Sequence, residues 1–241
     1  MKKGFVISLF TALTLSFLAF AQAVDGPDHL AKDVIKRLSY ENFKNIKLLT
    51  AAIFNYGGGE GEFDKLVQSY SEASSLYFSR EYERSAKKFQ ENELEIRETA
   101  MNIAKIYKED SEAMQKEIIE RDVRTRISKS LAGKKANESK KKMMSQSTAS
   151  ISLGKDNYER TRPIEAIEAY RIAKDRMLTY MYIEADDLPQ DIINECRKDR
   201  FERDKCLRDA KEKRRAEVRE RYEKIISDND NKVYISKEKA K

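Results

Sequence analysis

The sequence has few residues that end a helix and few that carry enzyme chemistry. Its 241 residues include 3 prolines, 8 glycines and no tryptophan, whereas 37% of them are charged. A chain rich in Lys, Glu, Arg and Ala and poor in turn formers favours long helices, and many charges favour helices with large exposed faces. The sequence therefore predicts an all-α protein, an elongated bundle of long helices.

His29 is the only histidine, which leaves few routes to catalysis. A Ser–His or Cys–His nucleophile needs a histidine base, and a zinc site needs several ligands at suitable spacing. Acidic residues are so abundant that chance carboxylate pairs do not indicate a glycosidase. We expect no enzyme activity, no catalytic residues, no metal site, no cofactor and no small-molecule substrate.

The N-terminal segment has the pattern of a secretory signal. Lys2 and Lys3 precede an apolar run from Phe5 to Ala21, and Ala21-Gln22-Ala23 has the small residues of a cleavage site. A membrane helix is the alternative, but the run is marginal for a bilayer and lacks a stop-transfer cluster. We expect residues 1–23 to be a cleaved signal peptide, with no membrane anchor afterwards. Cleavage removes two lysines and lowers the net charge from +6 to +4. An exported protein rarely meets nucleic acid, so none is expected as a partner.

Two cysteines in an exported chain suggest a disulfide, but their spacing opposes one. Cys196 and Cys206 lie in a stretch without Gly or Pro. If that stretch is a single helix, their Cα atoms are about 15 Å apart, too far for a disulfide. Either the helix breaks between them or each thiol is free, buried or paired with another chain. We expect them to be free or buried.

Periodicity divides the first half of the chain into two regions. Over 24–61, apolar residues at helical spacing predict one or two short helices that end at a glycine-rich connector, Gly57 to Gly61. Over 62–132, the pattern predicts a helical hairpin with a break near Ser79–Glu81 and a long second helix. The sequence leaves open whether the stretch from Tyr82 to Leu131 is one rod.

The second half of the chain is predicted in three parts. Residues 133–157 are poor in apolar side chains and rich in Lys and Ser, which predicts a flexible loop. Residues 158–227 are predicted to be helical, with Pro163 in a first turn, a stop at Asp186-Asp187-Leu188-Pro189, and one long charged helix from Pro189 to Ile226. Residues 228–241 are expected to fray.

Seven residues are candidates for contacts with other proteins. The aromatic side chains of Tyr77, Phe78, Tyr180 and Tyr182 would mark contacts if exposed, although burial in the core is the simpler explanation for most aromatic residues. The cluster Lys140, Lys141 and Lys142 would attract an acidic surface, unless it is an ordinary solvated loop.

The region from Asn55 to Asn92 carries two resemblances. Ala73, Leu76, Tyr82, Ser85 and Phe89 follow the small and large spacing of a tetratricopeptide helical pair. The segment 55–64, followed by Tyr70–Ala73, Leu76-Tyr77-Phe78 and Ser85–Phe89, resembles the flagellar-coiling proteins of leptospiral spirochaetes. The resemblance covers residues 40–130 most strongly, and the chain is closer in length to the smaller member of that family.

The resemblance to flagellar-coiling proteins implies a non-enzymatic structural protein of the periplasmic flagellar sheath. Such a protein coats the filament, helps to keep it coiled and so supports motility; its partners would be other sheath proteins and filament core proteins. The alternative is a tetratricopeptide-like periplasmic adaptor that binds another protein, for example a component of the flagellar motor collar. A solute-binding or enzymatic role is a third hypothesis, and the lack of pocket chemistry opposes it.

Overall fold

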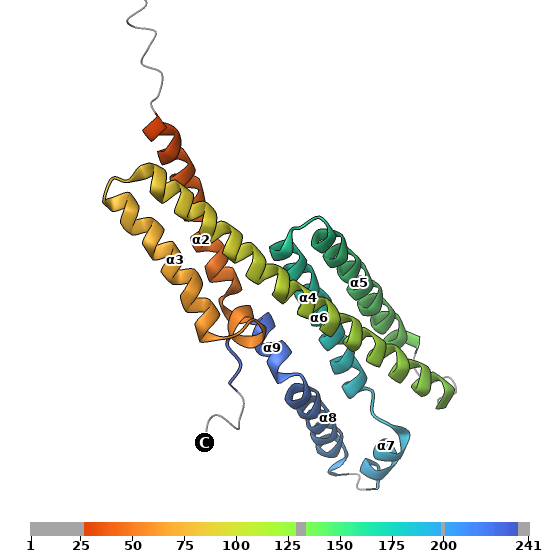
Figure 1. The fold of residues 1–241 in the computed structure, drawn as a ribbon. Helices are drawn as coiled ribbons and strands as arrows, with labels where there is room; N and C mark the ends of the chain where they lie inside the picture. The colour runs from red at the N-terminus through yellow and green to blue at the C-terminus, as the bar shows by residue number, and fades with distance from the viewer. Residues whose placement is uncertain (1–26, 129–133, 199–200, 236–241) are drawn as a thin grey trace, which may run out of the picture. The chain divides into compact units, whose positions relative to one another are not determined.

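The computed structural model describes residues 27–128, 134–198 and 201–235, and these residues form helices joined by short turns (Figure 1). No strand occurs among them, so the all-α prediction is confirmed. The helices are α2 (Pro27–Tyr56), α3 (Glu60–Phe78), α4 (Tyr82–Ser128), α5 (Lys134–Glu159), α6 (Pro163–Asp186), α7 (Gln190–Cys196), α8 (Arg203–Arg221) and α9 (Glu223–Asn229). The predicted signal peptide, residues 1–23, lies outside the described residues.

The chain divides into two compact units, which share three helices. Unit 1 contains the described residues up to Phe43 together with Gln68–Glu93, and unit 2 contains Lys44–Val67 and Leu94 onwards. Helices α2, α3 and α4 therefore each contribute residues to both units. The single helix α2 replaces the one or two short helices predicted, and α4 is one continuous helix of 47 residues.

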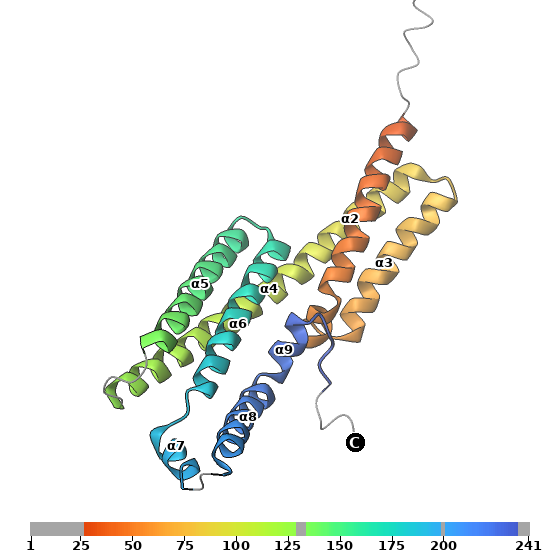
Figure 2. The same cartoon turned by 180° about the vertical axis from the view of Figure 1, so that it is seen from behind.

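Unit 1 is a three-helix arrangement around a small apolar core, with α2 and α3 side by side in both views (Figures 1 and 2). The core contains Ala31, Ile35, Leu38, Ala73, Ala86 and Phe89. Small residues bring α3 and α4 close together: Ala73 and Ser85 are fully buried, and the Ser85 hydroxyl donates a hydrogen bond of 2.8 Å to the Ala73 carbonyl. The predicted hairpin therefore forms, with small residues at its contact.

A tight turn between α3 and α4 confirms the predicted break. The Glu81 amide donates to the Leu76 carbonyl and the Arg80 amide donates to the Tyr77 carbonyl, the paired hydrogen bonds that close a Schellman turn. Arg80 adopts φ 64°, a left-handed conformation that glycine adopts more easily. The turn is thus formed without the glycine that usually marks it.

The glycine-rich connector between α2 and α3 lies where the sequence predicts it, but α3 already begins at Glu60 and Gly57 is tightly packed. Gly58 and Gly59 have φ of 99° and 72°. A Cβ on Gly57 would lie 2.9 Å from the Ile103 side chain, so this position brings the end of α2 against α4. The connector is therefore a packed corner.

The segment predicted as a flexible loop, 133–157, is helix α5 over its described part, so that prediction is wrong. Helix α5 lies beside α6 in both views (Figures 1 and 2), and Ser147, Ile151 and Gly154 are buried on its inner face. A Cβ on Gly154 would lie 2.6 Å from the Tyr170 ring. Small residues let two helices approach closely without large apolar side chains, which is why the composition was misleading.

The predicted long charged helix from Pro189 to Ile226 is also wrong, because the chain bends between α7 and α8. The stop after Asp186 and the start of α6 at Pro163 are confirmed. Beyond α7, however, the chain turns and Cys196 forms a disulfide with Cys206, with their Cα atoms 5.5 Å apart. The expectation of free or buried thiols fails because it assumed one unbroken helix.

The C-terminal segment, expected to fray from residue 228, is joined to α2 by hydrogen bonds as far as Tyr234, although most side chains of residues 230–235 are exposed. Helix α9 extends to Asn229, and the Asp228 side chain is fully buried. Beyond it, the backbone amide of Tyr234 donates a 2.7 Å hydrogen bond to the Asn55 side chain on α2. None of the described helices is both long and apolar enough to cross a bilayer.

Candidate functional site

The most exposed predicted contact residues lie at the C-terminal end of α3, in unit 1. Phe78 is 82% exposed and Tyr77 is 41% exposed. The Tyr77 ring packs against Phe78 at 5.8 Å and against Tyr82 of α4 at 5.7 Å between ring centres. Tyr77 is therefore held in place, while Phe78 presents most of its ring to solvent.

A groove of about 440 Å³ runs beside these two residues, between α2 and α3. Ile35 and Phe89, both buried, lie at its base, and Tyr70 packs edge-on against Phe89 at 5.4 Å. A neighbouring hollow on α2 shares Asp33 and Lys36 with the groove and is also lined by Tyr40, which is 70% exposed. Aromatic and apolar side chains therefore make up half of the groove lining, and charged side chains surround Tyr40 in the neighbouring hollow.

The groove and the neighbouring hollow together have one more basic than acidic side chain in their linings: Lys32, Lys36 and Arg37 against Asp33 and Glu41. Asp33 lies 3.5 Å from His29, and Arg37 lies 3.4 Å from Glu41. The Lys32 ammonium sits 4.3 Å from the centre of the Tyr82 ring. Lys36 is exposed, and no ion pair joins it to a carboxylate among the described residues.

The remaining predicted contact residues belong to unit 2 and do not form one surface. Tyr180 is only 2% exposed, and its hydroxyl donates to Asp122 at 3.1 Å, so it is a core residue. Lys140 is largely buried: its ammonium lies 3.5 Å from Asp187 and 5.8 Å from the Tyr180 ring. Tyr182 is half-buried, while Lys141 and Lys142 are exposed on α5.

Unit 2 contains a buried cluster of charged and aromatic side chains that the sequence did not reveal. Asp228 accepts hydrogen bonds from Tyr107, from Arg171 Nε at 3.2 Å and from Asn55 at 3.2 Å. The Lys174 ammonium, also fully buried, lies 3.7 Å from the centre of the Tyr107 ring. The cluster joins α2, α4, α6 and α9.

Burial lowers the pKa of Lys174 to about 8, and the nearby Asp228 and Asp110 carboxylates partly oppose that change. Its ammonium has no hydrogen-bond partner among the described residues, and it lies 3.7 Å from the centre of the Tyr107 ring and 5.0 Å from that of Tyr56. A lysine with a lowered pKa can be a nucleophile. Because Lys174 is completely enclosed, however, we assign the cluster to holding the helices and the C-terminal segment together.

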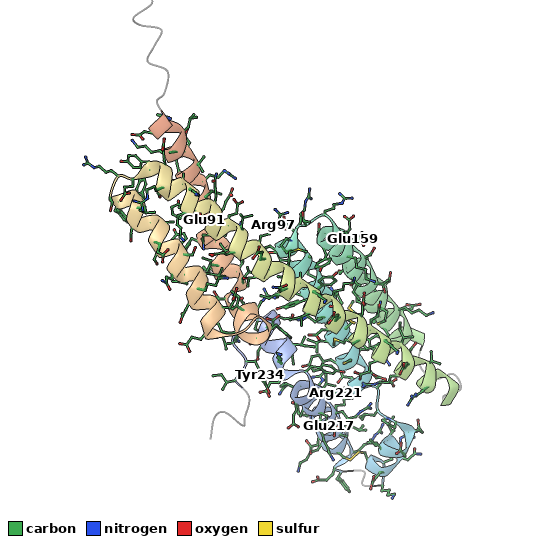
Figure 3. All side chains as sticks on the ribbon, viewed as in Figure 1. Glu91, Arg97, Glu159, Glu217, Arg221 and Tyr234 are labelled. Carbon is green, nitrogen blue, oxygen red and sulfur yellow. A yellow bond between two sulfur atoms is a disulfide. The ribbon has the colours of Figure 1, made fainter. Side chains whose placement is uncertain are left out.

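A small hollow of about 230 Å³ beside α8 is lined by both signs of charge. Glu217 and Arg221, both labelled in Figure 3, lie on its α8 wall. Arg121 donates to Glu117 at 2.6 Å and to Glu184 at 3.4 Å. These carboxylates already neutralise the arginines, so the hollow is a poor site for an anion. The described residues contain no group of His, Cys, Asp and Glu arranged to hold a metal ion.

Scans against protein-family models, curated proteins and solved structures found no match to this chain. Its family is therefore not shown, and the resemblance to the flagellar-coiling proteins stays a prediction.

Sequence reasoning missed Lys36 and Tyr40 at the groove because a surface helix normally carries such residues. The periodic apolar residues of the region 24–61 include Phe43, which is nevertheless 58% exposed and lies 6.2 Å from Tyr70 between ring centres. Spacing along the sequence cannot distinguish an exposed aromatic residue from a core residue when both lie near the same apolar face of a helix.

Proposed function

We propose that this chain is a non-enzymatic structural protein of the periplasmic flagellar sheath, where it helps to keep the filament coiled. The observation that carries the proposal is the exposure of Tyr77 and Phe78 within the stretch that resembles the flagellar-coiling proteins. Exposed aromatic residues are enriched at the centres of protein–protein contacts. A sheath subunit needs surfaces of this kind for neighbours in the sheath and in the filament core.

The disulfide supports the periplasmic location in this proposal. Disulfides persist in oxidising compartments and are rare in the cytosol. The bond between Cys196 and Cys206 is thus consistent with export, which the pattern at residues 1–23 also predicts.

The proposal is tested by deleting the gene and measuring the shape of isolated periplasmic filaments. We expect the filaments to lose their coiling and the cells to lose motility, and we expect a plasmid copy of the gene to restore both. Fully coiled filaments in the deletion strain would contradict the proposal.

A periplasmic adaptor is the second candidate function, because the groove between α2 and α3 would also suit a partner that is not part of the filament. A stoichiometric complex with a non-filament protein, such as a motor collar component, would favour this alternative. It predicts that isolated filaments keep their shape without the protein.

A further inference from the structure

We infer that the groove between α2 and α3 of unit 1 binds an amphipathic helix of a partner protein, with acidic residues along the edge of its apolar face. This inference rests on the proposed function, since it names the chemistry of one partner that the exposed aromatic residues contact. It depends on the shape, the apolar lining and the charge of the groove.

The shape suits a helix because two helices form the walls. The groove has a volume of about 440 Å³, and the adjoining hollow on α2 has about 560 Å³. The two share Asp33 and Lys36, which stand between them on the surface of α2. Helices commonly bind in such grooves through an apolar face, with anchors at i, i+3, i+4 and i+7.

The apolar lining offers contacts for such anchors. Phe78 is 82% exposed at the rim, Tyr77 is 41% exposed, and Ile35 and Phe89 lie below them. A bound helix would cover the Phe78 ring, removing apolar surface from water that unit 1 itself does not bury. Lys32, whose ammonium lies over the Tyr82 ring, lines the α2 wall of the groove.

The charge selects an acidic partner. Glu41 already pairs with Arg37, and the two lysines that line the groove, Lys32 and Lys36, outnumber its one acidic residue, Asp33. The exposed Lys36 has no carboxylate within ion-pair distance among the described residues. Glutamates beside the apolar face of a bound helix would complement Lys36 and Lys32. A second copy of this chain, docked by the same face, would instead place Lys36 near its own counterpart, which like-charge repulsion disfavours.

The test uses the disulfide-bonded chain from residue 24 to 241 and two labelled synthetic peptides of about five helical turns, or about 18 residues. One peptide has Leu and Phe on one face with flanking glutamates, and the other has lysine in place of each glutamate. Fluorescence anisotropy measures their binding. We expect the acidic peptide to bind at least about tenfold more tightly than the basic one, and less tightly as salt rises.

Two groove variants and two matched controls locate the site. Lys36→Glu and Phe78→Ser should each weaken binding of the acidic peptide by about tenfold, as expected for a charge contact and an aromatic anchor. The controls, at exposed positions of unit 2, are the same charge reversal at Lys105 of α4 (Lys105→Glu) and a comparable change of an apolar residue to Ser on α5 (Leu153→Ser). Each should alter binding by less than about twofold. Equal binding of the two peptides, or unchanged binding by both groove variants, would overturn the inference.

Two further measurements distinguish a partner helix from a second copy of the chain in the groove, and the inference about the groove from the proposed function. A dimer seen by sedimentation equilibrium that Phe78→Ser dissociates would make a second copy the occupant and overturn the inference. In the second measurement, the wild type and both groove variants are each pelleted with isolated filaments. If all three pellet equally, the inference about the groove is overturned but the proposed function still stands. Groove-dependent binding of the acidic peptide by a chain that does not pellet with filaments would support the inference and contradict the proposed function.

Discussion

The interior of unit 1 is apolar and aromatic, with Ile35, Leu38 and Phe89 near its centre, whereas the interior of unit 2 also encloses Lys174 and Asp228. The polar groups buried in unit 1, such as Asn42 and Ser85, are neutral. An apolar core tolerates small changes at moderate cost, but a buried charge becomes a large penalty when its partner is removed. The comparison predicts that unit 2 is the more sensitive to single polar substitutions.

The largest effect is expected from Asp228→Ala, which leaves Arg171 without its carboxylate and Lys174 without the negative charge that favours its ammonium most. Breaking a buried ion pair by removing one partner costs about 3–5 kcal/mol of unfolding free energy. Urea denaturation measures it. The matched control is Asp230→Ala, at an exposed ion pair with Lys232, which should cost less than about 1 kcal/mol. Equal losses for both variants would contradict the role of the cluster.

The next largest effect concerns the disulfide of unit 2. Replacing Cys196 and Cys206 together by Ser should lower the unfolding free energy by about 2–4 kcal/mol, because the unfolded chain loses a constraint. A reductant should destabilise the wild type by a similar amount and leave the double variant unchanged. If reductant left the unfolding free energy of the wild type unchanged, the prediction would be contradicted.

A third prediction uses pH to examine Lys174. Its folded-state pKa of about 8 lies below the value of about 10.4 for an unfolded lysine, so the unfolded chain binds more protons between these values. Stability should therefore rise from pH 8 to 10, by up to about 2 kcal/mol. Burial raises the pKa of Tyr56 and Tyr107, which makes stability fall again above pH 10, because the folded state then holds more protons.

Urea denaturation at a series of pH values checks this rise, with Lys174→Met as the variant that should abolish it. Lys105→Met, at an exposed position on α4, should keep it. A rise that survives in Lys174→Met would show that other groups cause it.

Unit 1 should respond less strongly to the loss of its buried amide. Asn42 donates to the Phe89 carbonyl at 2.9 Å and to Asn92 at 3.1 Å, and Asn42→Ala should cost about 1 kcal/mol, the typical value of a neutral hydrogen bond. The control, Gln90→Ala, changes an exposed amide on α4 and should have little effect. If Asn42→Ala lowered the unfolding free energy as much as Asp228→Ala, unit 1 would be as sensitive to polar substitutions as unit 2, and the predicted difference between them would be wrong.

The smallest effect is a gain in stability at the turn after α3. Arg80→Gly should raise the unfolding free energy by about 0.5–1 kcal/mol. At φ 64° the Cβ of Arg80 lies close to the backbone carbonyl oxygen that follows it, and glycine has no Cβ. Glu83→Gly, in the first turns of α4, should lower it by about 1 kcal/mol. Thermal melts of the two variants, shifted in opposite directions, would bear this out; shifts in the same direction would contradict it.

The sequence predicted the helices that bury large apolar residues at regular spacing. Helices α4 and α6 have clear periodic faces, and the turns at Gly57 and Arg80 lie where the pattern breaks. It did not predict α5, because Ser147 and Gly154 pack closely through their small size, which an apolar count ignores. Spacing along one helix reveals a face, but not how closely the partner helix approaches.

The site and the C-terminal region were predicted less well because they depend on partners far away in sequence. Asn55 and Asp228, 173 residues apart, meet only in the folded chain, and nothing in the local sequence marks Asp228 for burial. The sequence between Cys196 and Cys206, where the chain bends, contains no glycine or proline from which the bend could be predicted. The sequence expected most of the four candidate aromatic residues to be core; Tyr180 is, whereas Tyr77 and Phe78 are exposed.

The central proposal is that the protein coats the periplasmic flagellum, and immunogold labelling of isolated periplasmic flagella tests it most directly. Antibody raised against the chain should label wild-type filaments at regular intervals along their length and should not label filaments from a deletion strain. Label that is absent from the filaments but present elsewhere in the periplasm would contradict the sheath function and favour the adaptor.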